Sequence, residues 1–243
     1  MKDLTDTRIF YINLDNRPDR RKIFESQFAL SSMPPVQRIP AIQGMSVDVK
    51  NNKNIGMNTR VQVITEFRRS HYEIHSRGAI GASLSHLKTW KAFLKTDAKY
   101  ALILEDDAKL PATFSMMLKD CAINLPSKWD VWILGWTNNP IDVAEDINPF
   151  KRILHFIGAH CYIITRKAAK IFIDNFFPIE SHIEHYMNNV ALINNLIILR
   201  NIRLHVPQFD RKILVSDIRK PIGCPTCNVD DKEEAMEARR KNL

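Results

Sequence analysis

The chain has 243 residues, 45% of them hydrophobic, which is enough to bury one sizeable core. The formal charge of +8 favours polyanionic partners, but the basic residues are scattered and accompany no nucleic-acid-binding motif, so specific nucleic-acid binding is not expected. Neither a membrane-spanning apolar run nor the apolar centre of a signal peptide is present, so we expect a cytoplasmic protein that contacts a membrane only at its surface.

Predicted strands and helices alternate along the chain. Apolar, β-branched and aromatic runs predict strands at Ile9–Leu14, Tyr100–Leu104, Val131–Leu134, Cys161–Ile164 and Leu196–Leu199. Apolar residues at three- and four-residue steps predict helices over Arg21–Phe28, Gly81–Lys95, Ala168–Phe176 and Ile183–Ile193. This alternation indicates an α/β sandwich with a mostly parallel central sheet, whose ligands bind at the carboxyl ends of the strands.

The remaining segments read as connections and a tail. The stretch Lys50–His75 is polar and basic with little periodicity, so we expect a long connection there. We expect one domain over residues 1–220 and a tail over residues 221–243 that includes a charged helix. Four cysteines in this length do not make a disulfide scaffold; Cys121 and Cys161 are expected in the core, and Cys224 and Cys227 in a turn rather than a metal site.

Three carboxylates, Glu105, Asp106 and Asp107, follow directly on the predicted strand Tyr100–Leu104. Strand alternation would place Glu105 and Asp107 on one side and Asp106 on the other. Two carboxylates about 4 Å apart repel by roughly 4 kcal/mol near a protein surface, so a positive group should lie between them. Mn²⁺ or Mg²⁺ carrying a phosphate-bearing substrate suits such an oxygen-rich site; the alternative is a solvated acidic turn.

These carboxylates belong to a series of short motifs that keep one order along the chain. The series comprises Tyr11-Ile-Asn-Leu-Asp15 with Arg17-Pro-Asp-Arg20, Ile39-Pro-Ala-Ile-Gln-Gly44, Gly78-Ala-Ile-Gly-Ala-Ser-Leu-Ser-His86, Glu105-Asp-Asp107, Trp129-Asp130, Gly158-Ala-His-Cys-Tyr162, Pro178-Ile-Glu180 and Ser216-Asp-Ile218. Together they resemble glycosyltransferase family 25, which contains bacterial lipooligosaccharide galactosyltransferases and procollagen galactosyltransferases. The chain departs from the family pattern at Ala79, where Glu is usual, at Ala82, where Cys is usual, and at Glu180, where Asp is usual.

The resemblance implies a GT-A type, Rossmann-like fold and a metal-dependent enzyme. Such an enzyme would move a hexose, galactose or glucose, from a UDP-sugar to a hydroxyl of a glycan, glycolipid or protein, with inversion, for example in lipooligosaccharide biosynthesis. Two other hypotheses stay open. One is a non-catalytic glycan- or partner-binding module on a degenerate transferase fold, and the other is a metal-dependent phosphohydrolase.

The resemblance also implies roles for individual residues. Glu105 and Asp107 would hold Mn²⁺ or Mg²⁺, with His205, Gln208 or Asp210 as the third ligand. The base for the acceptor hydroxyl would be Glu180, with Asp130 and Asp217 as rivals. The nucleotide-sugar would contact Asn13, Leu14, Arg20, Ala41, Gly81, Ser85, His86 and Asp106. Ser85 and His86 are expected in the first turns of a helix, where backbone N–H groups favour phosphate.

Overall fold

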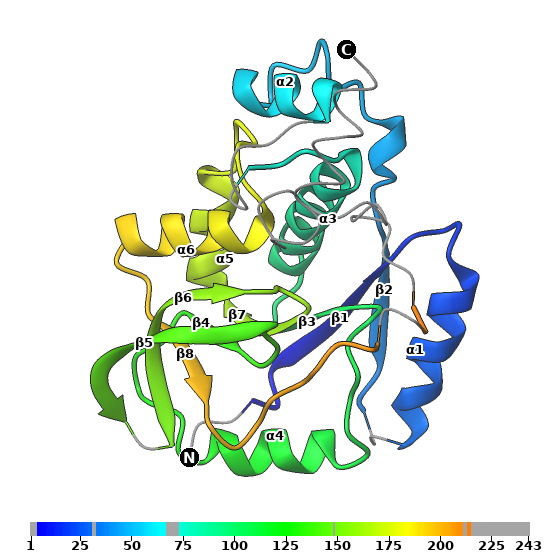
Figure 1. The fold of residues 1–243 in the computed structure, drawn as a ribbon. Coiled ribbons are helices and arrows are strands. Elements are labelled where there is room, and N and C mark those ends of the chain that lie inside the picture. The colour runs from blue at the N-terminus through cyan, green and yellow to red at the C-terminus, as the bar shows by residue number, and fades with distance from the viewer. Residues whose placement is uncertain (1–3, 31–32, 67–72, 148, 211–212, 215–243) are drawn as a thin grey trace, which may run out of the picture.

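The computed structural model describes residues 4–30, 33–66, 73–147, 149–210 and 213–214. Over these residues the chain forms an eight-stranded sheet in the order β2-β1-β3-β7-β4-β8-β6-β5, with helices on both faces (Figure 1). The strands are β1 Thr7–Asn13, β2 Val36–Pro40, β3 Tyr100–Glu105, β4 Val131–Ile133, β5 Asn138–Ile147, β6 Phe150–Ile157, β7 Cys161–Thr165 and β8 Ile198–Asn201. The helices are α1 Pro18–Leu30, the 3-10 turn η1 Gly44–Ser46, α2 Met57–Thr65, α3 Arg77–Leu94, α4 Phe114–Ala122, α5 Arg166–Asp174 and α6 Ile183–Ile193.

The expected α/β class is confirmed, with one correction to the sheet. The pairings β1–β2, β1–β3 and β4–β8 are parallel, whereas β3–β7, β4–β7, β5–β6 and β6–β8 are antiparallel. The sheet is therefore mixed rather than mostly parallel. The link from β5 to its neighbour β6 is only two residues long, whereas a crossover to a parallel neighbour needs a dozen or more.

The central strands are buried on both faces. Helices α3, α5 and α6 cover one face of the sheet, and α1 and α4 cover the other (Figure 1). Phe10 and Ile103 belong to the core on the first face, and Tyr11 and Leu102 to the core on the second. Because β1 and β3 are parallel neighbours, their carboxyl ends, at Asn13 and Glu105, reach the same edge of the sheet. None of the helices in the described ranges is long and apolar enough to span a membrane.

Helix α3 begins four residues earlier than predicted. The side chain of Ser76 accepts a hydrogen bond from the Ala79 N–H at 3.2 Å and thereby caps the helix at Arg77. Ser85 and His86 consequently lie more than two turns inside the helix, where their backbone N–H groups are used in helical hydrogen bonds. The expectation that this pair offers a helix N-terminus to phosphate is therefore wrong, and only the side chains can contact a ligand.

Several elements were not predicted, namely β2, β5, β6, α2 and α4. The segment Lys50–His75, expected to be a connection, contains helix α2; residues 67–72 lie outside the described ranges. The predicted charged helix, Cys224 and Cys227 also lie outside those ranges. Cys121 and Cys161 are free and buried, as expected.

Arg166 holds the carboxyl end of α3 through three backbone carbonyls. Its guanidinium donates to the carbonyl oxygens of Leu94, Thr96 and Ala98 at 3.0, 2.6 and 3.2 Å. We expect Arg166→Met to lower the free energy of unfolding by about 1.5–3 kcal/mol, because these carbonyls lose a charged donor. Thermal unfolding measures this as a loss of several degrees in Tm. Lys170→Met on the exposed side of α5, which removes only an exposed ion pair with Asp174, should change Tm little.

Candidate active site

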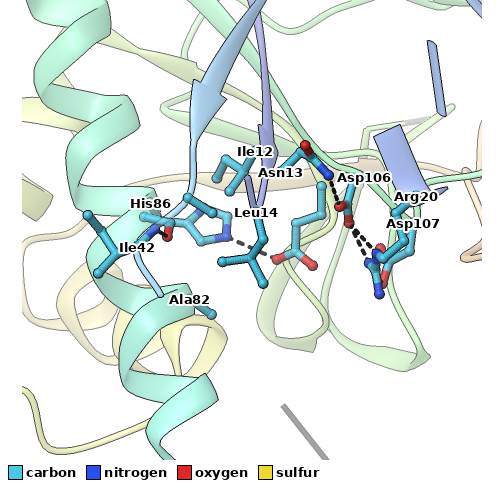
Figure 2. Close-up of a pocket in the computed structure, with 12 residues that line it drawn as sticks. Ile12, Asn13, Leu14, Arg20, Ile42, Ala82, His86, Asp106 and Asp107 are labelled. Carbon is cyan, nitrogen blue, oxygen red and sulfur yellow. Dashed lines mark hydrogen bonds and ion pairs between the residues drawn. The ribbon is translucent and has the colours of Figure 1, made fainter. Parts of the chain in front are cut away.

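A pocket opens where β1 and β3 end, against the middle of α3 (Figure 2). Its cavity volume is about 90 Å³, and the space at its mouth is open to solvent. It is lined by Ile12, Asn13, Leu14, Arg20, Ala41, Ile42, Ala82, Ser85, His86, Glu105, Asp106 and Asp107. Every residue predicted to contact the nucleotide-sugar except Gly81 is on this wall, together with the two predicted carboxylate ligands of the metal.

Asp106 is held by an arginine and an asparagine from other elements. Arg20 of α1 donates to its Oδ1 through Nε at 2.9 Å and also through Nη2, and Asn13 donates to its Oδ2 at 2.7 Å. Asp106 therefore turns into the pocket wall, contrary to the alternation predicted from strand geometry. The strand ends at Glu105, and the two aspartates lie in the turn that follows, where alternation no longer applies.

Asp107 is the carboxylate whose charge is least well compensated. Arg20 lies 3.1 Å from its Oδ2, and the Gln208 amide donates to both of its oxygens at 3.3 Å. Burial and repulsion from Glu105 nevertheless raise the pKa of Asp107 above its usual value, although Arg20 acts in the opposite direction. An added positive charge at this carboxylate would therefore be stabilising.

Glu105 is paired with His86 of α3. The distance from His86 Nε2 to Glu105 Oε1 is 3.0 Å, and the His86 ring is buried. Burial, the largest single effect, would raise the pKa of Glu105, but the hydrogen bond from His86 and the nearby positive groups, Arg20 among them, together outweigh it and place that pKa below its usual value. Glu105 is thus a carboxylate at neutral pH, and one of its oxygens, Oε1, is hydrogen-bonded to His86.

The donor set fits a hard divalent cation that shares its coordination with a ligand. Two carboxylates, Glu105 and Asp107, line one pocket, and their mutual repulsion is only partly offset by Arg20. No group of three His, Cys, Asp or Glu side chains in the described ranges is arranged to hold a metal ion. Mg²⁺ and Mn²⁺ commonly take one or two protein carboxylates and complete an octahedron with waters and substrate phosphates.

Two of the other predicted site residues lie away from the pocket wall. Asp130 is at the opposite edge of the sheet, before β4, where it accepts from the Ile197 N–H at 2.9 Å and pairs with Lys167 at 3.0 Å. His205 contacts the Trp136 carbonyl at 3.0 Å and packs at a tilt against the Trp136 ring, and burial lowers the pKa of His205. The structure therefore supports neither Asp130 as the base nor His205 as a ligand; Gln208 reaches Asp107 instead.

Glu180, the predicted base, is not brought to the carboxylates. Glu180 is exposed and lies against Gly56, where a bridge between Ile55 and Ile179 joins its segment to the start of α2. Asp217 lies outside the described ranges, and Asp210 is exposed on the segment after Gln208. The base for an acceptor hydroxyl remains a prediction.

Arg38 was missed by sequence reasoning. Its Nε donates to Asn13 Oδ1 at 3.0 Å, and its Nη2 donates to the Asn13 carbonyl at 3.2 Å and to Asp15 at 2.5 Å. It thereby orients the asparagine that holds Asp106. Arg38 belongs to β2, which follows two prolines and alternates weakly, so neither the strand nor its pairing with β1 was predicted.

Gly81 shapes the pocket from behind rather than lining it. A Cβ at this position would lie 2.6 Å from the Ile42 carbonyl oxygen and 2.8 Å from the Gly44 nitrogen. We therefore expect Gly81→Ala to displace the loop that carries Ala41 and Ile42, and to lower both Tm and the affinity for pocket ligands, measured by thermal unfolding and calorimetry. Lys91→Ala on the exposed face of α3 should change neither; unchanged binding by Gly81→Ala would show that the loop adapts.

Residues 6–149 match the family described as glycosyltransferase family 25 (LPS biosynthesis protein). A putative glycosyltransferase R655 of Acanthamoeba polyphaga mimivirus is 24% identical over 183 residues, which are 70% of this chain and 53% of that protein. A glycosyltransferase 25 family member of Drosophila pseudoobscura pseudoobscura is 31% identical over 46% of this chain and 17% of its own length. Procollagen galactosyltransferase 1-B of Xenopus laevis is 25% identical over 60% of this chain and 24% of its own length.

The chain spans about half or less of the length of these relatives. The family match nevertheless covers more than half of the chain, and it includes β1, α1, α3, β3 and the three carboxylates that line the pocket. The chain belongs to glycosyltransferase family 25.

Proposed function

We propose that this protein transfers a hexose, galactose or glucose, from a UDP-sugar to a hydroxyl of a glycan, glycolipid or protein, with inversion and with Mn²⁺ or Mg²⁺ as cofactor. The observation that carries the proposal is the meeting of Glu105, Asp107 and Arg20 in one pocket at the carboxyl ends of β1 and β3. Membership of a glycosyltransferase family and a relative named a galactosyltransferase support the reaction and the hexose.

The proposed roles follow from what the reaction requires. When a sugar leaves a diphosphate, negative charge grows on the leaving oxygen, and a bound divalent cation supplies the positive charge that stabilises it. Glu105 and Asp107 would hold that cation. Arg20 fixes both aspartates, so its role is to set their positions rather than to bind phosphate alone. Glu180 stays the predicted base.

A thermal-shift screen of UDP-, GDP- and CMP-sugars, each with Mn²⁺ and with EDTA, tests the proposal. A ligand at one hundred times its Kd stabilises the native state by about 2.7 kcal/mol. In a protein of this size that raises Tm by roughly 5–10 °C. We expect this shift with UDP-sugars and Mn²⁺ only. Equal shifts in EDTA, or none with any donor, would contradict it.

Turnover separates the transferase from the two other hypotheses. With UDP-galactose or UDP-glucose and a panel of glycan acceptors, we expect UDP release that depends on an acceptor. Equal release of sugar or phosphate with and without acceptor would indicate a hydrolase. Binding of donor or glycan without any turnover would indicate a binding module.

A further inference from the structure

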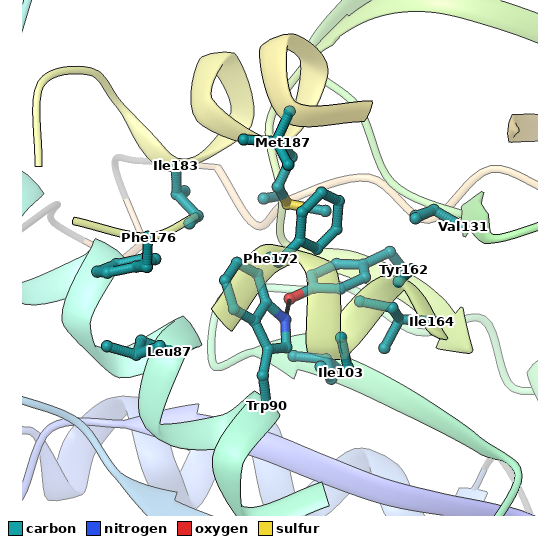
Figure 3. Close-up of a cluster of buried hydrophobic side chains, with 14 of the residues drawn as sticks. Leu87, Trp90, Ile103, Val131, Tyr162, Ile164, Phe172, Phe176, Ile183 and Met187 are labelled. Atoms are coloured by element: carbon teal, nitrogen blue, oxygen red, sulfur yellow. Dashed lines mark hydrogen bonds between the residues drawn. The ribbon is translucent and has the colours of Figure 1, made fainter. Parts of the chain in front are cut away.

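A buried chain of hydrogen bonds leads from the core to the pocket. The Trp90 indole N–H donates to the Tyr162 hydroxyl at 2.8 Å, as Figure 3 shows. The same hydroxyl lies 2.8 Å from Nδ1 of His86, whose Nε2 lies 3.0 Å from Glu105 Oε1. Figure 2 shows the His86 end of this chain at the pocket wall. It links α3, β7 and the end of β3.

The direction of each bond follows from counting protons. Trp90 can only donate, and the Glu105 carboxylate can only accept. The single hydrogen of the Tyr162 hydroxyl is then free to donate to His86 Nδ1, which leaves the His86 proton on Nε2, where it donates to Glu105. This tautomer, assigned from the hydrogen-bond pattern, gives every donor an acceptor.

The chain of hydrogen bonds is rigid because the side chains that form it are buried. Trp90 and Tyr162 have no exposed surface, and His86 is 1% exposed. The His86 ring stacks on Tyr162 with centroids 5.8 Å apart, and Phe172, Phe176 and Tyr186 surround the Trp90 ring. An imidazole bonded at both nitrogens cannot turn without breaking two buried hydrogen bonds.

We infer that Tyr162 and His86 are positioning residues for the donor site: they hold Glu105 by Oε1 and reserve Oε2 for the cation and its bound diphosphate. This inference rests on the proposed function. Outer partners of this kind typically change metal affinity or activity 10–100-fold when they are lost. Loss of a purely structural hydrogen bond would lower stability without changing the affinity for the metal, so the two interpretations predict different measurements.

Two substitutions of His86 separate its two nitrogens. Glutamine carries its amide N–H₂ about where Nε2 lies, so His86→Gln retains a donor to Glu105. Asparagine reaches only as far as Nδ1, so His86→Asn retains contact with Tyr162 but loses Glu105. Affinity for Mn²⁺, alone and with UDP, is measured by loss of the free Mn²⁺ signal in electron paramagnetic resonance. We expect His86→Gln to remain within about threefold of the wild type and His86→Asn to bind at least tenfold more weakly.

Tyr162→Phe tests the far end of the chain by removing one oxygen. We expect a three- to tenfold loss of Mn²⁺–UDP affinity. Tyr186→Phe is the matched control, since its hydroxyl donates to the Phe172 carbonyl at 2.6 Å in the same core and has no link to Glu105. It should lose stability but no affinity. Equal affinities for His86→Gln and His86→Asn, or equal losses for the two tyrosine variants, would overturn the inference.

A ligand-free measurement keeps this inference distinguishable from the proposed function. Imidazole ¹⁵N resonances of the free wild type should show His86 protonated at Nε2 alone, and Tyr162→Phe should weaken this preference. If the wild type binds neither Mn²⁺ nor UDP, the proposed function fails, whatever the tautomer. If the wild type binds both but shows mixed His86 tautomers, only the inference that Tyr162 and His86 position Glu105 is refuted.

Discussion

Asp107→Asn is expected to remove Mn²⁺-dependent UDP binding while leaving the free protein at least as stable as the wild type. The substitution keeps the shape of the side chain and its contact with Gln208 but removes the charge that would hold a cation. Losing an outer partner of a metal ligand already weakens metal binding 10–100-fold, so losing a ligand itself should weaken Mn²⁺-dependent UDP binding at least about a hundredfold. Calorimetric titration with UDP in the presence of Mn²⁺ measures this loss.

The stability of the same variant should change in the opposite direction. Burial and Glu105 raise the pKa of Asp107 in the folded state above its ordinary value near 3.9. A raised pKa means that protonated Asp107 favours the folded state, and that this contribution is lost as the pH rises through the folded-state value. Asparagine stays neutral throughout, so the Tm of Asp107→Asn should exceed that of the wild type above the raised pKa and match it below about pH 4.

Asp120→Asn on the exposed end of α4 is the control, and it should alter neither binding nor the pH dependence of Tm. A variant at Asp107 that binds UDP and Mn²⁺ like the wild type would remove this residue from the metal site. A lower Tm at neutral pH would show instead that Arg20 already compensates its charge fully.

Local patterns in the sequence predicted the elements that lie at the centre of the fold. The strand that ends at Glu105 is apolar throughout and buried on both faces, and α6 begins and ends at the predicted residues because its apolar positions recur regularly. The edge of the sheet was missed. β6 carries Lys151, Arg152 and His155 on its partly exposed positions, so its composition does not indicate a strand.

The charge balance of the pocket could not be predicted from sequence. The acidic triplet requires a positive group beside it, and that group was predicted to be a metal ion. Part of that charge comes from Arg20, which is 86 residues from Asp106 in the chain. Strand periodicity likewise gave the wrong side for Asp106, because only the folded chain shows that β3 ends one residue before it. Pairings that depend on the packing of α1 against the sheet leave no local signal.

Arg20→Met is expected to be among the most destabilising single changes in this protein. The side chains of Arg20 and Asp106 are 8% and 9% exposed, and Asp107 lies beside them. Removing one partner of a buried ion pair leaves the other charge without compensation, at a cost of about 3–5 kcal/mol. Tm should fall by roughly 6–20 °C. Arg21→Met, one position along α1, breaks the exposed pair with Glu25 and a smaller interaction with Tyr11, and should cost at most about 1 kcal/mol.

A double-mutant cycle with Asp106→Leu separates the pair from its surroundings. If the main cost of Arg20→Met is the stranded charge of Asp106, the double variant will be less destabilised than the sum of the single variants, by about 0.5–3 kcal/mol. Asp107 keeps its charge in all four proteins, so the part of the loss that the double variant does not recover reports the contact of Arg20 with Asp107 together with the lost hydrogen bond from Asn13 to Asp106. A double variant that regains stability but still fails to bind Mn²⁺ and UDP would mean that this ion pair exists to place Asp107. Strict additivity would mean that Arg20 and Asp106 act on the fold independently, despite their contact.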